Sequence, residues 1–222
     1  METLIGQVLP YCAVIVFVVG ALYRIGNWMR APKKLNWKLY PVPQGIVGEA
    51  RYILEEWTSF KTLFRNNRPV WLGSYVFHVA LVALVLWFML FLFGLSVPWL
   101  VSLGAVAMMG SSVYLFAVRL WVPQMRVLSS VVEFFNLALF IGIGWALVSL
   151  TGEGYGQEAR TYFIGLLSLR ASAPPESGAF IVLLLLAEFF LAYLPFSKMF
   201  HMASKYFAYH KGRWFNPYQI AH

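Results

Sequence analysis

Apolar side chains dominate five long stretches of the chain, and polar residues gather between them. The stretches cover residues 8–29, 70–95, 98–121, 129–151 and 178–201. Each is long enough for a helix to cross a hydrocarbon core of about 30 Å. Because lipid offers no hydrogen bonds to an open backbone, such runs predict α-helices. The pattern therefore predicts an all-α integral membrane protein, a five-transmembrane-helix bundle forming one membrane domain over residues 1–222.

The connections carry weaker patterns. Over residues 48–66, apolar residues recur at helical spacing on one face and charged residues occupy the other, which predicts an amphipathic helix. We expect it on the cytoplasmic membrane surface or under a partner subunit. Residues 35–43, LNWKLYPVP, contain two prolines and cannot form a long helix. The loop over residues 151–178 is expected to be irregular, with a short helix near residues 160–169.

Composition indicates which solvent surrounds the chain, and the distribution of charge indicates how the spans are oriented in the membrane. Hydrophobic residues make up 60% of the chain and charged residues 12%, so its solvent is lipid. Nine of the 17 Lys and Arg residues lie between Arg24 and Arg68, and others flank the third span and the C-terminal end. By the positive-inside rule this places the C-terminus in the cytoplasm and the N-terminus outside, in a cytoplasmic (inner) membrane. The basic excess thus reports topology and not nucleic-acid binding.

Two histidines lie inside predicted spans, and ionisable residues there suggest function. His78 follows the cytoplasmic start of the second span, and His201 lies at the cytoplasmic end of the fifth. Antiparallel helices would bring both imidazoles to a similar depth, where a pair of neutral histidines can hold a b-type haem. The alternative is that each ring bonds a neighbouring carbonyl. The single cysteine, Cys12, excludes an iron–sulfur cluster or a Cys-ligated zinc held by this chain alone.

The segments GSYVFH, ending at His78, and PFSKMFH, ending at His201, resemble the cytochrome b subunit of respiratory nitrate reductase, the gamma-subunit family. Five helices carry haem in that family, with two ligand histidines ten residues apart on the second helix and two that are eighteen apart on the fifth. His78 and His201 match one of each pair. Phe88 and Leu183 stand where the other two would be.

The resemblance therefore implies one haem b, the one nearest the cytoplasm, ligated by His78 and His201. Its anionic propionates would need basic partners, and the candidates are Arg68, Arg119, Arg126 and Lys198. A second haem ligated by Met89 and ligation by His210 are alternatives. Over an unbroken helix Leu183 and His201 would lie about 27 Å apart. A quinone at the outer face would then be too far from the haem for fast direct electron transfer. Menaquinone or another quinone would therefore bind in the cytoplasmic half or to another subunit.

Two glutamates in the predicted spans lack an assigned role. Glu133 lies near the cytoplasmic start of the fourth span and could bond a quinone oxygen or simply be solvated. Glu188 lies deep in the fifth span, where a carboxylate is costly unless it is protonated or paired. It could bond another helix or belong to a proton path.

LNWKLYPVP and the amphipathic helix also resemble the membrane cytochromes of sulfate reducers and methanogens that pair with heterodisulfide-reductase-like subunits. These resemblances imply an electron-transfer subunit linking the quinone pool, or another membrane subunit, to a cytoplasmic iron–sulfur subunit. That partner would be heterodisulfide-reductase-like or nitrate-reductase-beta-like, with further membrane and periplasmic cytochromes as additional partners. The direction of electron flow is not encoded. A haem-free membrane anchor is the main rival, and a small transporter is disfavoured because the chain has no repeated halves.

Overall fold

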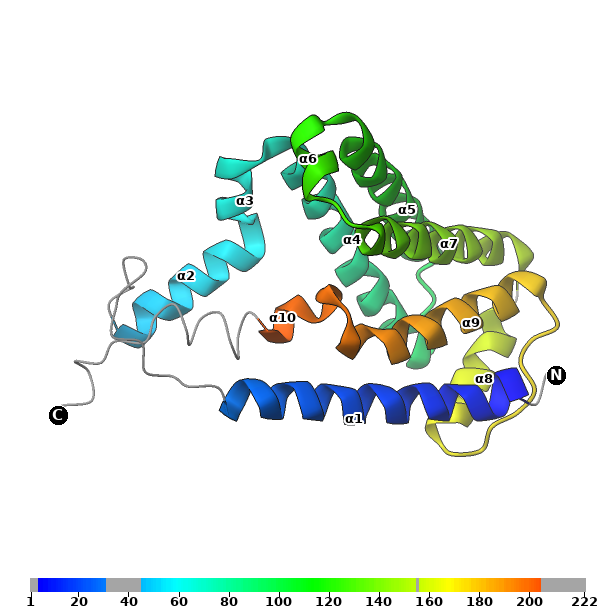
Figure 1. Ribbon diagram of the computed structural model, residues 1–222. Helices are drawn as coiled ribbons and strands as arrows, with labels where there is room; N and C mark the ends of the chain where they lie inside the picture. Colours follow the sequence, from blue (N-terminus) through cyan, green and yellow to red (C-terminus); the bar gives the residue numbers. More distant parts are fainter. Residues whose placement is uncertain (1–3, 31–44, 155, 205–222) are drawn as a thin grey trace. The chain divides into compact units, whose positions relative to one another are not determined.

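The computed structural model describes residues 4–30, 45–154 and 156–204, and all regular elements in these ranges are helices (Figure 1). Five helical segments are long and apolar enough to cross a membrane, which confirms the predicted fold class. They are built on α1 (Leu9–Arg30, preceded by the π-helical η1, Leu4–Val8), α4 (Arg68–Leu92), α5 (Pro98–Trp121), α7 (Val131–Glu153) and α9 (Gly178–Tyr193).

Shorter helices connect these spans. They are α2 (Gly45–Ser59), α3 (Lys61–Asn66), α6 (Pro123–Leu128), α8 (Gly156–Leu167), η2 (Leu194–Phe196), η3 (Lys198–Phe200) and α10 (His201–Ser204). Residues 35–43, His210 and the rest of the basic C-terminal tail lie outside the described residues.

The chain divides into two compact units where the sequence suggested one domain. The first contains the residues up to Tyr11 and Phe60–Phe190, and the second contains Cys12–Ser59 and the residues from Leu191 onward. The divisions fall within α1, between α2 and α3, and near the end of α9. Each unit is described by itself.

The core of the first unit is formed by α4, α5 and α7, with α5 packed against both of the others. Small residues allow this close approach. A Cβ atom added at Gly144 of α7 would lie 2.8 Å from the Cβ of Met109 and 3.2 Å from the carbonyl oxygen of Ala105, both on α5. Helices that cross a membrane commonly use glycine in this way, because van der Waals contact then replaces the missing hydrophobic drive.

The described part of α9 in this unit packs on α7 through aromatic rings. Phe190 meets Phe140 with ring centroids 5.2 Å apart, and Phe189 meets Phe135 at 5.8 Å. At the other end of α9, Phe180 and Leu184 form a buried cluster with Tyr162 of α8. This contact fixes α8 against α9.

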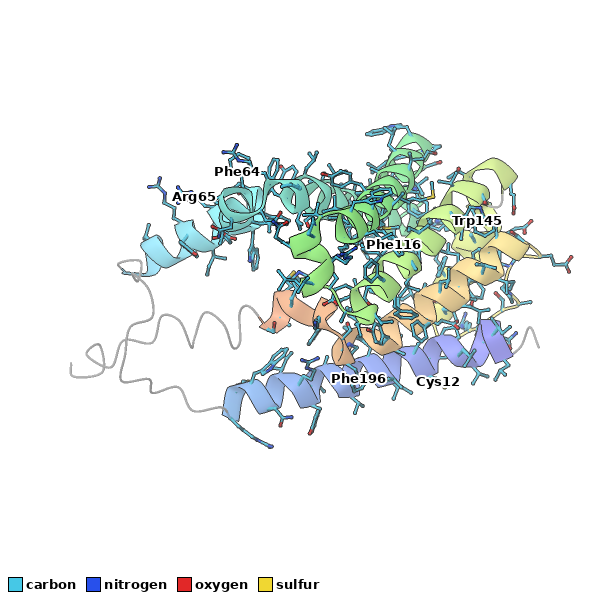
Figure 2. All side chains as sticks on the ribbon, turned by 45° about the horizontal axis from the view of Figure 1, so that its top comes forward. Cys12, Phe64, Arg65, Phe116, Trp145 and Phe196 are labelled. Atoms are coloured by element: carbon cyan, nitrogen blue, oxygen red, sulfur yellow. The ribbon has the colours of Figure 1, made fainter. Side chains whose placement is uncertain are left out.

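Many large apolar side chains remain exposed along the long helices. Val82 on α4, Leu103 on α5 and Trp145 on α7 are each more than half exposed, and Figure 2 shows Trp145 among the side chains drawn on the ribbon. Exposed apolar surface on this scale is unfavourable in water and is expected where lipid is the solvent.

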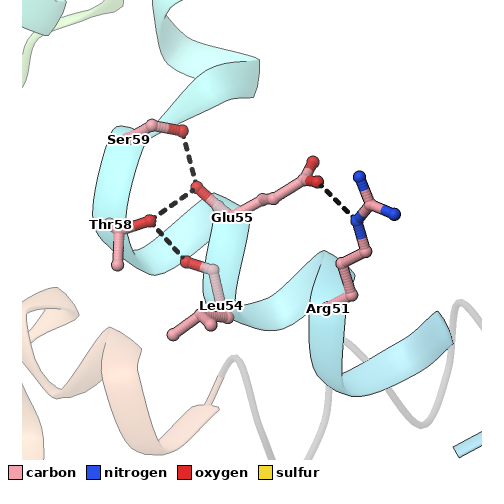
Figure 3. Close-up of polar contacts among 5 residues, drawn as sticks. All are labelled: Arg51, Leu54, Glu55, Thr58 and Ser59. Atoms are coloured by element: carbon pink, nitrogen blue, oxygen red, sulfur yellow. Dashed lines mark hydrogen bonds and ion pairs between the residues drawn. The ribbon is translucent and has the colours of Figure 1, made fainter. Parts of the chain in front are cut away.

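The segment predicted as an amphipathic helix over residues 48–66 is helical, but the structure divides it into two helices, α2 and α3, which are separated at Phe60. Phe60 has φ 49° and ψ 44°, a left-handed conformation that ends a helix. The hydroxyl groups of Thr58 and Ser59 donate to the carbonyls of Leu54 and Glu55, at 2.8 and 2.6 Å, and so occupy acceptors of the last turn of α2 (Figure 3).

The fifth span is present over Gly178–Phe196. It does not continue as one α-helix to residue 201, since α9 ends at Tyr193. Pro195 lacks a backbone N–H and its ring crowds the carbonyl four residues earlier, which stops an α-helix. The chain continues through η2, an extended Ser197 and η3 before α10 begins at His201. The 27 Å helical separation expected between Leu183 and His201 therefore does not apply.

Candidate functional site

His78 lies in the first half of α4, and its ring is oriented by the backbone of its own helix. Its Nδ1 is 2.7 Å from the carbonyl oxygen of Ser74. Because a carbonyl oxygen only accepts, Nδ1 carries the proton and donates this bond. In the neutral ring, Nε2 then carries the lone pair that can bind a metal. A histidine whose second nitrogen donates to a backbone carbonyl is the usual arrangement of a metal-ligating imidazole.

Aromatic rings surround the imidazole of His78. Phe60 and Phe77 both meet it nearly edge-on, with ring centroids 4.9 and 5.4 Å away. Phe77 is buried and packs in turn against Phe140 of α7 at 4.7 Å. The ring is thus held in an apolar environment, which suits a flat apolar cofactor.

His201 lies in the second unit, at the first position of α10, and its side chain is exposed. Arg24 of α1 holds the segment that precedes it. One guanidinium nitrogen, Nη1, donates to the carbonyl oxygens of Pro195 and Ser197, at 2.7 and 3.2 Å. These carbonyls lie beyond the end of α9 and therefore lack the partners that a continuing helix would give them. By bonding them, Arg24 stabilises the turn that leads to His201.

The residue before His201 is held by the same helix. Phe200 stacks on Trp28 with ring centroids 6.0 Å apart and meets Phe17 edge-on at 6.4 Å. The guanidinium of Arg24 lies 5.1 Å from the Trp28 ring centroid. The role of Arg24 in this turn could not be predicted from the sequence, since nothing in the local sequence links it to residues more than 170 positions away.

The basic residues expected to bind propionates differ in their environment. Arg119, on α5, donates from Nη1 to the hydroxyl oxygen of Ser129 at 2.9 Å, while its Nε is buried with no hydrogen-bond partner among the described residues. An unmet buried donor on a cation fits an anionic group. Arg126 and Lys198 are exposed, and exposed Arg68 lies over the Phe64 ring at 5.2 Å.

Phe88 stands where the resemblance leads us to expect a further haem ligand, and Met89 is the neighbouring alternative. Phe88 meets Phe163 of α8 edge-on with ring centroids 5.1 Å apart. Met89 is 46% exposed, on another side of α4. Phe88 therefore packs between α4 and α8, and the loss of a second haem stays a prediction.

Glu133 has a structural role that the sequence could have revealed. It forms a capping box with Ser130, in which its carboxylate accepts from the Ser130 backbone N–H at 2.8 Å and from the Ser130 hydroxyl. The spacing S-x-x-E before an apolar run is the signature of this motif. The bond stabilises the start of α7.

The predicted site residues belong to different compact units. His78 and Arg119 belong to the first unit, and His201 and Lys198 belong to the second. Within each unit, backbone and aromatic contacts position the histidine or the residue beside it. The pairing of His78 with His201 stays a prediction.

Comparisons with known proteins identify a similar oxidoreductase subunit. No known family model matches the chain. The sequence is 25% identical, over 260 aligned residues, to the Hdr-like menaquinol oxidoreductase cytochrome b-like subunit of Archaeoglobus fulgidus. The alignment covers 91% of this chain and 77% of that protein.

Proposed function

We propose that the chain is a haem b-containing membrane subunit that transfers electrons between a quinone, such as menaquinone, and a cytoplasmic iron–sulfur subunit. The observation that carries the proposal is the hydrogen bond from Nδ1 of His78 to the Ser74 carbonyl, which leaves Nε2 as the ligating nitrogen. The name of the archaeal relative, a cytochrome b-like subunit of a menaquinol oxidoreductase, supports the same function.

The residues present fit a haem b. His78 and His201 would hold the haem iron through their imidazoles, and Arg119 would offer its buried Nε to a propionate. When bound, such a haem accepts and releases single electrons. The chain itself orients the ring of His78 through Ser74, packs Phe60 and Phe77 against it, and supports the His201 segment through Arg24.

The partner subunit would dock on the basic side of the membrane. The segment between Arg24 and Arg68 is strongly basic, and α2 within it exposes Leu54 and Trp57. By the positive-inside rule this side is cytoplasmic, together with the C-terminus. A heterodisulfide-reductase-like iron–sulfur protein is the partner that best agrees with the relative's name.

The test is reduction of the purified protein by a menaquinol analogue, followed by visible absorption. The proposal predicts that a b-type band appears on mixing and is absent from His78→Ala. A colourless protein that still binds its iron–sulfur partner would contradict the proposal and support a haem-free anchor.

A further inference from the structure

Phe60 has a backbone conformation that its residue type does not favour. It stands alone between α2, which ends at Ser59, and α3, which begins at Lys61. Its φ of 49° and ψ of 44° lie in the left-handed region, where the Cβ of an ordinary residue crowds the backbone. Residues other than glycine keep such a conformation only where the surrounding structure holds them, and they cluster at functional sites and switches.

The ring of Phe60 lies against the face of α4 that carries His78. Its centroid is 4.9 Å from that of the His78 imidazole and 6.0 Å from that of the Tyr75 ring, and it meets both rings edge-on. Tyr75 and His78 are three residues apart, so they lie on the same side of α4. A residue of the connection before α4 thus packs on the imidazole that the proposed function assigns to haem.

The chain that follows Phe60 is anchored to α4. The carbonyl oxygen of Phe60 accepts from the backbone N–H of Phe64 at 2.9 Å. The Phe64 ring meets Trp71 of α4 with ring centroids 4.8 Å apart, and α3 as a whole packs against α4. The position of Phe60 beside His78 is therefore set within the first compact unit.

The chain that precedes Phe60 belongs to the other compact unit. The division between the units falls at the bond from Ser59 to Phe60. The hydroxyls of Thr58 and Ser59 bond carbonyls of α2 itself, so this helix stays regular up to the junction (Figure 3). Because Phe60 is the single residue between the two helices, its torsion angles determine the direction in which α2 leaves α3.

We infer that Phe60 couples the binding of the iron–sulfur partner on α2 to the position of the His78 imidazole. This inference rests on the proposed function, in which α2 exposes Leu54 and Trp57 to the partner and His78 holds haem. A partner that holds α2 in one direction also holds the torsion angles of Phe60, and with them the ring that packs on His78. Phe60 is in this account a positioning residue, since it acts on the haem through His78.

The coupling must act in both directions. If binding on α2 changes the binding of haem at His78, then haem changes the behaviour of α2 by the same free energy. Haem at His78 should therefore restrain the end of α2, even when the partner subunit is absent.

The test measures hydrogen–deuterium exchange of the purified full chain, produced with haem and in a haem-deficient host. The inference predicts that haem slows amide exchange several-fold in the last turn of α2, residues 55–59. Phe60→Ala should abolish this haem-dependent difference, whereas Phe60→Tyr, which keeps an aromatic ring, should preserve it. Phe64→Ala is the matched control and should also preserve it, because the Phe64 ring packs on Trp71.

The haem-dependent difference distinguishes coupling from packing, because a Phe60 ring that only packs would slow exchange equally with and without haem. A difference that persists in Phe60→Ala, or that is missing from the haem-loaded wild type, would overturn the inference and leave the proposed function standing. A wild-type chain that takes up no haem would contradict the proposed function and the inference with it. If Phe60→Ala does not fold or hold haem, Phe60→Leu, which keeps an apolar side chain without a ring, replaces it, and the same two results decide.

Discussion

At the scale of single residues, short-range bonds hold two polar side chains of the spans: His78 bonds the carbonyl of Ser74, and Glu133 caps the start of α7 together with Ser130. His78 was identified because an ionisable group in an apolar run is rare. A bond to a neighbouring carbonyl was the alternative considered for this ring, and His78 makes such a bond to Ser74. The sequence could not name Ser74 as the partner, because the rotamer decides whether a helical histidine bonds its own helix. Glu133 was misleading for the opposite reason, since its role is local and follows from the spacing to Ser130.

Arg119 and Arg126 provide a matched test of propionate binding. Arg119→Gln should weaken haem retention, because it removes the cation whose buried Nε lacks a partner. Arg126→Gln should have little effect, because Arg126 is exposed and a surface charge contributes about 0–1 kcal/mol. The rate of haem transfer to apomyoglobin measures retention. Equal rates in both variants would argue against a propionate contact at Arg119.

Tyr162 should cause the stability of the folded protein to fall at alkaline pH. Its pKa is raised by burial in the folded chain, whereas an unfolded phenol ionises near pH ~10. Above that pH the unfolded state loses a proton that the folded state keeps, so stability falls as pH rises. Thermal unfolding in detergent should show Tyr162→Phe less stable than wild type at pH ~8, by about 1 kcal/mol for the lost bond to Gly6. This difference should shrink towards pH ~11, and a constant difference would show that the phenol titrates normally.

At the scale of elements, the length of each apolar run predicted the position of a span. Run length did not reveal the breaks within helices. The third span was predicted at residues 98–121, which are the bounds of α5. The break at Pro195 was readable from the proline itself, yet the apolar run around it concealed the end of α9. The break at Phe60 was not readable, because Phe rarely adopts positive φ. The hydroxyl bonds of Thr58 and Ser59 that accompany it in the last turn of α2 were not predicted either.

The contact between α5 and α7 depends on Gly144. Gly144→Ala should destabilise the protein by about 1–3 kcal/mol, because the new methyl group would meet Met109 and the backbone of Ala105. Gly110→Ala is the control, since nothing lies within 4 Å of a Cβ added there. Thermal unfolding in detergent compares the two. A stable Gly144→Ala variant would show that α5 and α7 pack less closely than described.

The turn before His201 depends on Arg24. Arg24→Gln should loosen this turn, because it removes charge-assisted bonds to Pro195 and Ser197 that are each worth about 1.5–3 kcal/mol. We expect faster proteolysis near His201 and lower haem occupancy. Arg30→Gln, at the exposed end of the same helix, should leave both unchanged. Intact haem occupancy in Arg24→Gln would show that His201 does not need this support.

At the scale of the whole molecule, the five long apolar runs together with the composition predicted the class, an all-α membrane protein. The arrangement of the two histidines did not follow from it, because they belong to different compact units. The prediction of a single haem rests on the resemblance alone, in which Phe88 and Leu183 stand where further ligands are expected. The contact of Phe88 with Phe163 shows only that Phe88 packs against α8.

The central claim is that one haem b is held by His78 and His201. The most direct measurement is the pyridine-haemochrome count per polypeptide in purified wild type, His78→Ala, His201→Ala and the control His210→Ala. The account predicts one haem b in the wild type and in the control, and none in either of the other variants. Two haems per chain, or haem retained in His78→Ala or His201→Ala, would contradict it.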